Sequence, residues 1–300
     1  MDMTPANLQA LFKAYNTNFQ QGFNSLGEQG ALYEMFCTVV PSTTAVEVYP
    51  WLKSLPRMRE WLGDRVINSL EGADFSIKNR KFELTEGIER DAIEDDTYGL
   101  YGPVFDEFGR LSREHPNELA VEALEKNPMC FDGQPFFDAD HPVLDKKGEV
   151  ISVTNDMGGT GPAWYVMDLS RAIKPMVFQR RRDYTFRAIT NLNDSEVFMK
   201  DKFLFGTDAR VNAGSGLWML AVRSKQALTP ENYKAAREAL QAMKGDYERP
   251  LAVRHTHTMV PSTLEGAALK ILKNQLASGG ESNEWMDTSK LIMNPWLATA

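Results

Sequence analysis

His255 and His257 come nearest to a catalytic or metal-binding pair by residue type and spacing. They flank Thr256 within residues 251–260, which alternate as a β-strand, so both imidazoles are predicted on one face. Such a pair could serve a metal-dependent hydrolase, but zinc needs a third protein ligand and none stands at a recognisable spacing. We therefore expect polar side chains on a half-exposed strand with no bound metal, and keep the hydrolase as an alternative.

A loop rich in glycine and proline, residues 128–162, holds a second polar cluster. Asp138, Asp140 and His141 lie close together within it. Carboxylate oxygens bind hard cations, but no further oxygen ligand completes a cage, so we expect ordinary loop hydrogen bonding. The glycine run that begins at Gly158 lacks the lysine and the helix of a phosphate-binding loop, which indicates a flexible connection.

The basic run Arg180-Arg181-Arg182 could contact nucleic acid, pair with carboxylates of a neighbouring molecule, or end a solvated strand. A general nucleic-acid binder needs a basic surface to displace counterions, whereas this chain carries a net charge of −8. Motifs of serine hydrolases, phosphate-binding loops and zinc proteases do not occur. We therefore predict no catalytic residue, no cofactor and no metal.

Two cysteines, Cys37 and Cys130, are too few for a disulfide framework in 300 residues and indicate reduced, buried thiols. The sequence contains no apolar run of the ~20 residues that span a bilayer. The N-terminal residues lack the basic and apolar regions of a secretory signal. A location outside membranes, in a reducing compartment, is expected.

The N-terminal half combines two amphipathic helices with a segment that is poor in core residues. Residues 5–23 repeat apolar side chains at helical spacing, with Thr4 as N-cap. From 51 to 90 the chain reads as a protruding strand hairpin, which needs a partner outside its own subunit. Residues 91–126 form a helical pattern that Pro116 should kink or split.

The C-terminal half is predicted to be rich in strands. Residues 163–224 contain several β-like runs, and the helix predicted over 229–243 begins at an N-cap threonine. A helix over 262–276 should start with a capping box formed by Ser262 and Glu265. Leu291 begins a final short strand, which we expect to pack beside the β-rich segment.

Several runs together resemble the Mu-like phage major head subunit family across nearly the whole chain. No single run is diagnostic, but their order and spacing together are specific. The runs are Glu94-Asp95-Asp96, Phe131-Asp132-Gly133-Gln134-Pro135-Phe136-Phe137 with Asp140-His141-Pro142, Ala163-Trp164-Tyr165 with Asp168-Leu169-Ser170-Arg171, Lys174-Pro175 with Phe178-Gln179, Phe205-Gly206 with Asp208-Ala209-Arg210, Gly216-Leu217-Trp218, Val260-Pro261 with Leu264-Glu265, and Asn294-Pro295-Trp296-Leu297.

The resemblance implies an α+β chain with the Hong Kong 97-type phage capsid fold. The implied parts are an N-terminal arm (1–48), an E-loop hairpin (49–92), the spine helix of a peripheral domain (93–128), a loop and β-rich segment (129–224), and axial-domain helices with a C-terminal strand (225–300). Strands that usually end such chains here precede the helix at 229, which suggests a permuted segment order.

The resemblance also implies a function and partners. The chain is expected to be a major capsid subunit that self-assembles as pentamers and hexamers into an icosahedral shell around double-stranded DNA, without specific DNA binding and without a membrane. Scaffold, portal and maturation protease are the implied partners, and the virion, assembled in the bacterial host cytoplasm, is the implied location. An encapsulin-like nanocompartment shell is the alternative that shares the fold.

Two groups of residues are expected to act between subunits. The expected arm contacts are Leu11, Phe12, Tyr15 and Phe19. The expected E-loop contacts are Trp61, Lys78, Arg80 and Lys81.

Overall fold

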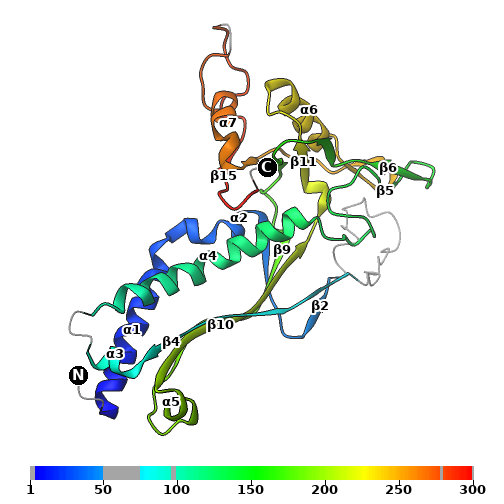
Figure 1. The fold of residues 1–300 in the computed structure, drawn as a ribbon. Coiled ribbons are helices and arrows are strands. Elements are labelled where there is room, and N and C mark those ends of the chain that lie inside the picture. The colour runs from blue at the N-terminus through cyan, green and yellow to red at the C-terminus, as the bar shows by residue number, and fades with distance from the viewer. Residues whose placement is uncertain (1–3, 50–74, 96–98, 278–279, 299–300) are drawn as a thin grey trace.

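The structure is a computed structural model that describes residues 4–49, 75–95, 99–277 and 280–298. It is elongated, with long helices and a four-stranded sheet at one end and a five-stranded sheet at the other (Figure 1). No helix in these ranges is long and apolar enough to cross a bilayer.

Two long helices pack side by side along the first part. Helix α1 spans Pro5–Ser25, and the Thr4 side chain accepts a hydrogen bond from the Asn7 N–H, so the predicted cap is confirmed. Helix α4 spans Gly102–Lys126 and runs through a buried Pro116 as one helix, so the predicted split there is wrong. The helical pattern predicted from residue 91 is divided between α4 and the short α3, Arg90–Glu94.

The four-stranded sheet lies beneath these helices in the order β1-β9-β10-β4. Its strands are β1 (Cys37–Pro41), β4 (Arg80–Glu89), β9 (Met176–Ile189) and β10 (Lys202–Ser215). Alternate residues of β10 from Phe203 to Ala213 are buried, which is the pattern of a strand with one covered face. Helix α4 contacts β9 and β10, and α1 contacts β9.

Aromatic rings fill the space between α1, α4 and the sheet. Tyr15 stacks on Phe105 of α4 with ring centroids 4.2 Å apart, and Phe19 stacks on Phe186 of β9 at 5.1 Å. Phe205 of β10 meets Phe105 edge to face at 4.9 Å. Helix α1 is therefore part of its own subunit's core.

The five-stranded sheet has the order β15-β14-β8-β11-β7. Its strands are β7 (Asp156–Gly159), β8 (Trp164–Met167), β11 (Ala221–Lys225), β14 (His257–Val260) and β15 (Lys290–Met293). The predicted association of the C-terminal strand with the β-rich segment is thus confirmed at the level of one sheet, although β14 stands between β15 and β8. Helices α6 (Pro230–Gln241) and α7 (Glu265–Leu272) contact this sheet.

Smaller elements complete the fold and correct several sequence predictions. They are α2 (Tyr33–Phe36), α5 (Ser195–Lys200), β2 (Val46–Val48), β3 (Ser76–Lys78), β5 (His141–Leu144), β6 (Val150–Val153), β12 (Lys244–Gly245) and β13 (Arg249–Pro250).

The loop predicted over 128–162 thus contains strands. The strand predicted over 251–260 is regular only from His257, since Ala252 has φ +50°. The capping box is wrong: a 3-10 turn at Ser262–Leu264 precedes α7, whose first turn has no side-chain cap.

The segment around residue 79 changes strand partner. Strand β3 pairs with β2, whereas β4 pairs with β10, and Asn79 separates them. The Asn79 amide is buried and donates to Ser42 Oγ at 2.8 Å and to the Thr44 carbonyl at 2.9 Å. Strands β3 and β4 therefore belong to different sheets and do not pair with each other.

Candidate functional site

His255 and His257 lie in different surroundings. His255 is buried, and its ring nitrogens lie 3.0 Å from Thr258 Oγ1 and 3.4 Å from the Tyr233 hydroxyl. Burial, with a smaller contribution from Arg237, lowers the pKa of His255 to about 4, so the imidazole is neutral at pH 7. The prediction of a half-exposed surface histidine is therefore wrong at this position.

His257, at the start of β14, is half-buried and its Nδ1 lies 2.9 Å from Thr256 Oγ1. Burial also lowers the pKa of His257, and Lys290 adds to the shift. Within the described ranges, no three His, Cys, Asp or Glu side chains are grouped to hold a metal ion. The two histidines serve hydrogen bonding inside the fold.

His141, the first residue of β5, joins the loop after α4 to the 3-10 turn that precedes β11. Its ring is fully buried and lies flat on Trp218, with centroids 3.8 Å apart and an angle of 6°. Its Nδ1 lies 2.7 Å from Asp132 Oδ2. Asp138 accepts from the Asp140 N–H at 2.9 Å, so these carboxylates and His141 shape the loop, as predicted, rather than converging on one point.

The first two residues of the glycine run, Gly158 and Gly159, belong to strand β7, and Thr160 and Gly161 follow it. Gly159 ends β7 with φ +106°, and a Cβ there would lie 2.3 Å from the Lys225 backbone of β11. Glycine is required because the two backbones approach too closely for a side chain.

The three arginines of the basic run also lie within a strand, β9. Arg180 donates to the Tyr33 hydroxyl at 2.5 Å and pairs with Asp183, and Arg182 pairs with Asp208 of β10. The run is therefore not a solvated strand end, and only Arg181 is left without an ion pair in the described structure.

The four predicted arm residues face their own subunit. Tyr15 and Phe19 are 5% and 1% exposed, so they have no surface left to bury against a neighbour. Leu11 and Phe12 are partly buried against the same aromatic cluster. The expectation that all four pack on another subunit is wrong for Tyr15 and Phe19. Helical spacing showed which face of α1 is apolar but not which partner covers it.

The predicted E-loop residues do not come together on one loop. Trp61 lies outside the described residues. Lys78 is exposed at the end of β3 and Lys81 is exposed on β4. Arg80 pairs with Glu122 of α4 at 3.6 Å and lies over the Phe82 ring. Their role between subunits stays a prediction.

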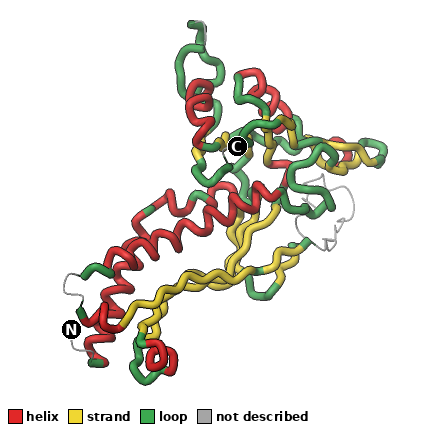
Figure 2. The backbone as a smooth tube through the Cα atoms, viewed as in Figure 1, coloured by secondary structure: helices red, strands yellow, loops and turns green. Residues whose placement is uncertain are grey.

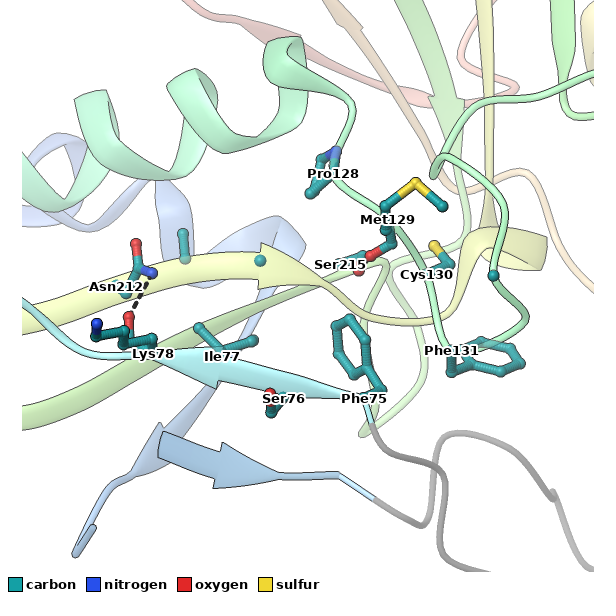
Figure 3. A pocket seen from close by; sticks show the side chains of 13 residues that line it. Phe75, Ser76, Ile77, Lys78, Pro128, Met129, Cys130, Phe131, Asn212 and Ser215 are labelled. Atoms are coloured by element: carbon teal, nitrogen blue, oxygen red, sulfur yellow. Dashed lines mark hydrogen bonds between the residues drawn. The ribbon is translucent and has the colours of Figure 1, made fainter. Parts of the chain in front are cut away.

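A pocket of about 530 Å³ lies where the two parts of the molecule meet (Figure 3). Phe75 and Ile77 form one wall, and Met129 and Cys130, from the loop after α4, form the other (Figure 3). Burial raises the pKa of the Cys130 thiol far above its usual range, which keeps it protonated and a poor nucleophile. Without an acid–base pair in its lining, this pocket does not resemble an active site.

The comparisons with known proteins agree on one family. The model of the family "Mu-like prophage major head subunit gpT" matches residues 8–297. The Mu-like prophage FluMu major head subunit of Haemophilus influenzae is 41% identical over 309 residues, which cover 99% of either chain. The major capsid protein of Escherichia phage Mu is 37% identical over 308 residues, which cover 99% of this chain and all of that protein.

A solved structure extends the likeness to the fold. The chain superimposes on a protein of the bacteriophage JBD30 procapsid with a TM-score of 0.84 and 37% identity, covering 98% of this chain and 100% of the other. The fold is therefore a mixed α+β phage capsid fold, and the hydrolase and encapsulin-like alternatives are set aside. The chain belongs to the Mu-like prophage major head subunit gpT family and is a major capsid protein, a structural component of a phage head and not an enzyme.

Proposed function

We propose that this chain self-assembles as pentamers and hexamers into an icosahedral shell of the Hong Kong 97 type, which encloses double-stranded DNA. The observation that carries the proposal is the likeness to the JBD30 procapsid protein over nearly the full length of both chains. A subunit that matches a shell protein throughout, with no large insertion, can occupy the same kind of lattice position.

The two sheets support a domain assignment within that fold. The four-stranded sheet with α1 and α4 corresponds to the peripheral domain, and α4 to its spine helix. The five-stranded sheet with α6 and α7 corresponds to the axial domain. Strands β2 and β3 form the base of the proposed E-loop, and contacts to a neighbour would come from Lys78 and Lys81 and from the outer side of α1.

The charge of the chain fits a container better than a DNA-binding protein. A net charge of −8 repels phosphate, so DNA inside the shell would be enclosed without sequence-specific contacts. Scaffold, portal and maturation protease remain the proposed partners during assembly in the host cytoplasm.

Expression of the chain alone, followed by velocity sedimentation and negative-stain microscopy, tests this proposal. We expect closed shells, or ring-shaped pentamers and hexamers, at micromolar concentration. A chain that sediments as a monomer at high concentration, alone and with the other head proteins of its phage, would contradict it.

A further inference from the structure

One face of the four-stranded sheet is left uncovered. Helices α1 and α4 lie along one side of the sheet strands β4, β9 and β10 (Figure 2). In the part that the structure describes, no helix lies along most of the opposite side of this sheet. On β10, the alternate residues from Lys202 to Asn212 point to this open side and are half-exposed. The open face is therefore available to another molecule.

Three cations stand side by side across this face. Arg210 of β10 is in register with Lys81 of β4 on one side and with Arg182 of β9 on the other. Lys81 lies directly opposite Arg210 and projects to the same face. The pairing of β9 with β10 is irregular at Arg210, but the ion pair of Arg182 with Asp208 places Arg182 on this face as well, so the three form one cationic row. Arg182 pairs with Asp208, but neither Lys81 nor Arg210 forms an ion pair within the described residues. The Arg210 Nε is buried and lacks a hydrogen-bond partner there.

A row of like charges destabilises a sheet unless an anion lies against it. Glu83 and Asp208 occupy the next cross-strand row, so the cationic surface is one row wide, which matches a few carboxylates of a protein better than the continuous phosphate backbone of nucleic acid. A second copy of this chain, with its net charge of −8, can supply such carboxylates.

The acidic counterpart lies at the far end of the same edge strand. Residues 86–95 carry five carboxylates against one arginine, and their sequence is Glu-Gly-Ile-Glu-Arg-Asp-Ala-Ile-Glu-Asp. Glu86 and Asp91 are exposed and form no ion pair in the described structure. Glu89 lies eight residues from Lys81 along β4, about 26 Å at the rise of an extended strand. The acidic run and the cationic row therefore cannot meet within one subunit.

We propose that the cationic row Lys81–Arg210–Arg182 is an inter-subunit docking surface that receives the acidic run 86–95 of a second copy of this chain. This inference rests on the proposed function, because it needs copies that assemble. The contact is head to tail along the long axis of the sheet, and it gives Arg210 and Lys81 ion-pair partners, which neither has within the described residues of its own subunit.

Charge reversal tests the contact. The double variant Lys81→Glu and Arg210→Glu should keep the circular dichroism spectrum and the Tm of the unassembled subunit but lose the particle fraction in sedimentation. Lys147→Glu is the matched control, because it reverses an exposed lysine in the turn between β5 and β6 and should assemble as the wild type does. Reversal of the acidic run by Glu86→Lys and Asp91→Lys should also abolish particles.

The decisive variant combines all four reversals, which should restore particles because each new carboxylate meets a new lysine. Normal particles from the Lys81/Arg210 variant would overturn the inference, whether or not the particles retain less nucleic acid. Failure of the fourfold variant to assemble, with both double variants folded, would equally overturn it. If the wild type and Lys147→Glu form no particles under any condition, it is the proposed function that fails.

Discussion

Substitution of Gly109 by alanine tests the packing of α1 on α4. The two helices touch through their backbones: a Cβ on Gly109 would lie 1.9 Å from the Phe19 carbonyl oxygen and 2.6 Å from the Phe23 nitrogen. Gly22 of α1 is matched in the same way, since a Cβ there would lie 1.7 Å from the Asp106 carbonyl oxygen. Neither position offers a flexible side chain that can move aside.

The magnitude follows from the gap that alanine would force. Ordinary contact begins near 3.4 Å, so α1 must move away by about 1.5 Å. A gap of 0.5–1 Å already forfeits a quarter to a half of the dispersion attraction, so a shift of about 1.5 Å forfeits about half or more. Leu8, Tyr15 and Phe19 each contribute ~1.5–3 kcal/mol by burial, so ~2–4 kcal/mol is lost. Alanine's better helix propensity returns up to ~1 kcal/mol, which leaves a net destabilisation of about 1–3 kcal/mol.

Thermal unfolding of the unassembled subunit, followed by circular dichroism, measures the effect. We expect a fall in Tm of about 2–6 °C for Gly109→Ala. The matched control is Gly266→Ala in α7, where a Cβ would meet nothing within 4 Å, so its Tm should stay the same or rise slightly. Equal Tm values for wild type and Gly109→Ala would refute the backbone-to-backbone packing of α1 on α4.

Four further outcomes follow from the buried groups. His255→Ala should lower the free energy of unfolding by ~2–4 kcal/mol at pH 7.5, measured by urea unfolding. The substitution opens a cavity and removes one hydrogen-bond partner each from Thr258 and Tyr233. The pKa of His255 in the folded state, about 4, is below its unfolded value, so protonation destabilises the folded state as the pH falls. Between pH 7.5 and pH 5 the free energy of unfolding should therefore fall by about 2 kcal/mol more for wild type than for this variant. An equal fall in both proteins would contradict the lowered pKa of His255. His141→Ala should lower stability by ~2–4 kcal/mol through the lost Trp218 stack, whereas an unchanged urea midpoint would contradict it. Deletion of residues 1–25 should give insoluble protein, since it uncovers the aromatic cluster, and a soluble folded product would show that α1 is dispensable.

Local signals in the sequence predicted where a helix begins when an N-cap residue precedes it. Thr4 before Pro5 marked the start of α1, and Thr229 before Pro230 marked the start of α6, because each threonine side chain accepts a hydrogen bond from the first turn. The same logic failed at Ser262, where a 3-10 turn comes first and the hydroxyl points to the Met293 sulfur. A capping motif predicts a helix start only when the chain enters the helix directly.

Partners distant in the sequence were beyond such signals. The alternation of residues around His255 suggested a half-exposed strand, but Tyr233 of α6 and Ser289 before β15 close over it. Likewise, the apolar stripe of α1 predicted a docking helix, and only the structure shows that Phe105 and Phe186 of the same chain receive it. Periodicity identifies the buried face, whereas the partner depends on tertiary contacts that no local pattern encodes.

The two parts of the molecule are joined more firmly than a single linker would allow. Within the described residues the chain passes between them near Met129, Pro175 and Gly216. These three crossings are bonded together: Ser215 Oγ donates to the Met129 carbonyl at 2.6 Å, and the Gly216 N–H donates to the Pro175 carbonyl at 2.8 Å. A Cβ on Gly216 would lie 2.7 Å from that carbonyl oxygen, so glycine is needed for the close approach.

One apolar cluster also runs through the junction. It includes Phe178 of the first sheet together with Trp164 and Ile292 of the second, and it is separate from the aromatic cluster between α1, α4 and the first sheet. A single crossing would act as a hinge, whereas three bonded crossings over a shared core resist rotation. Any change in the angle between the two parts must therefore be taken up by bending along β9 and β10, the long strands that leave the junction, and not at the crossings themselves.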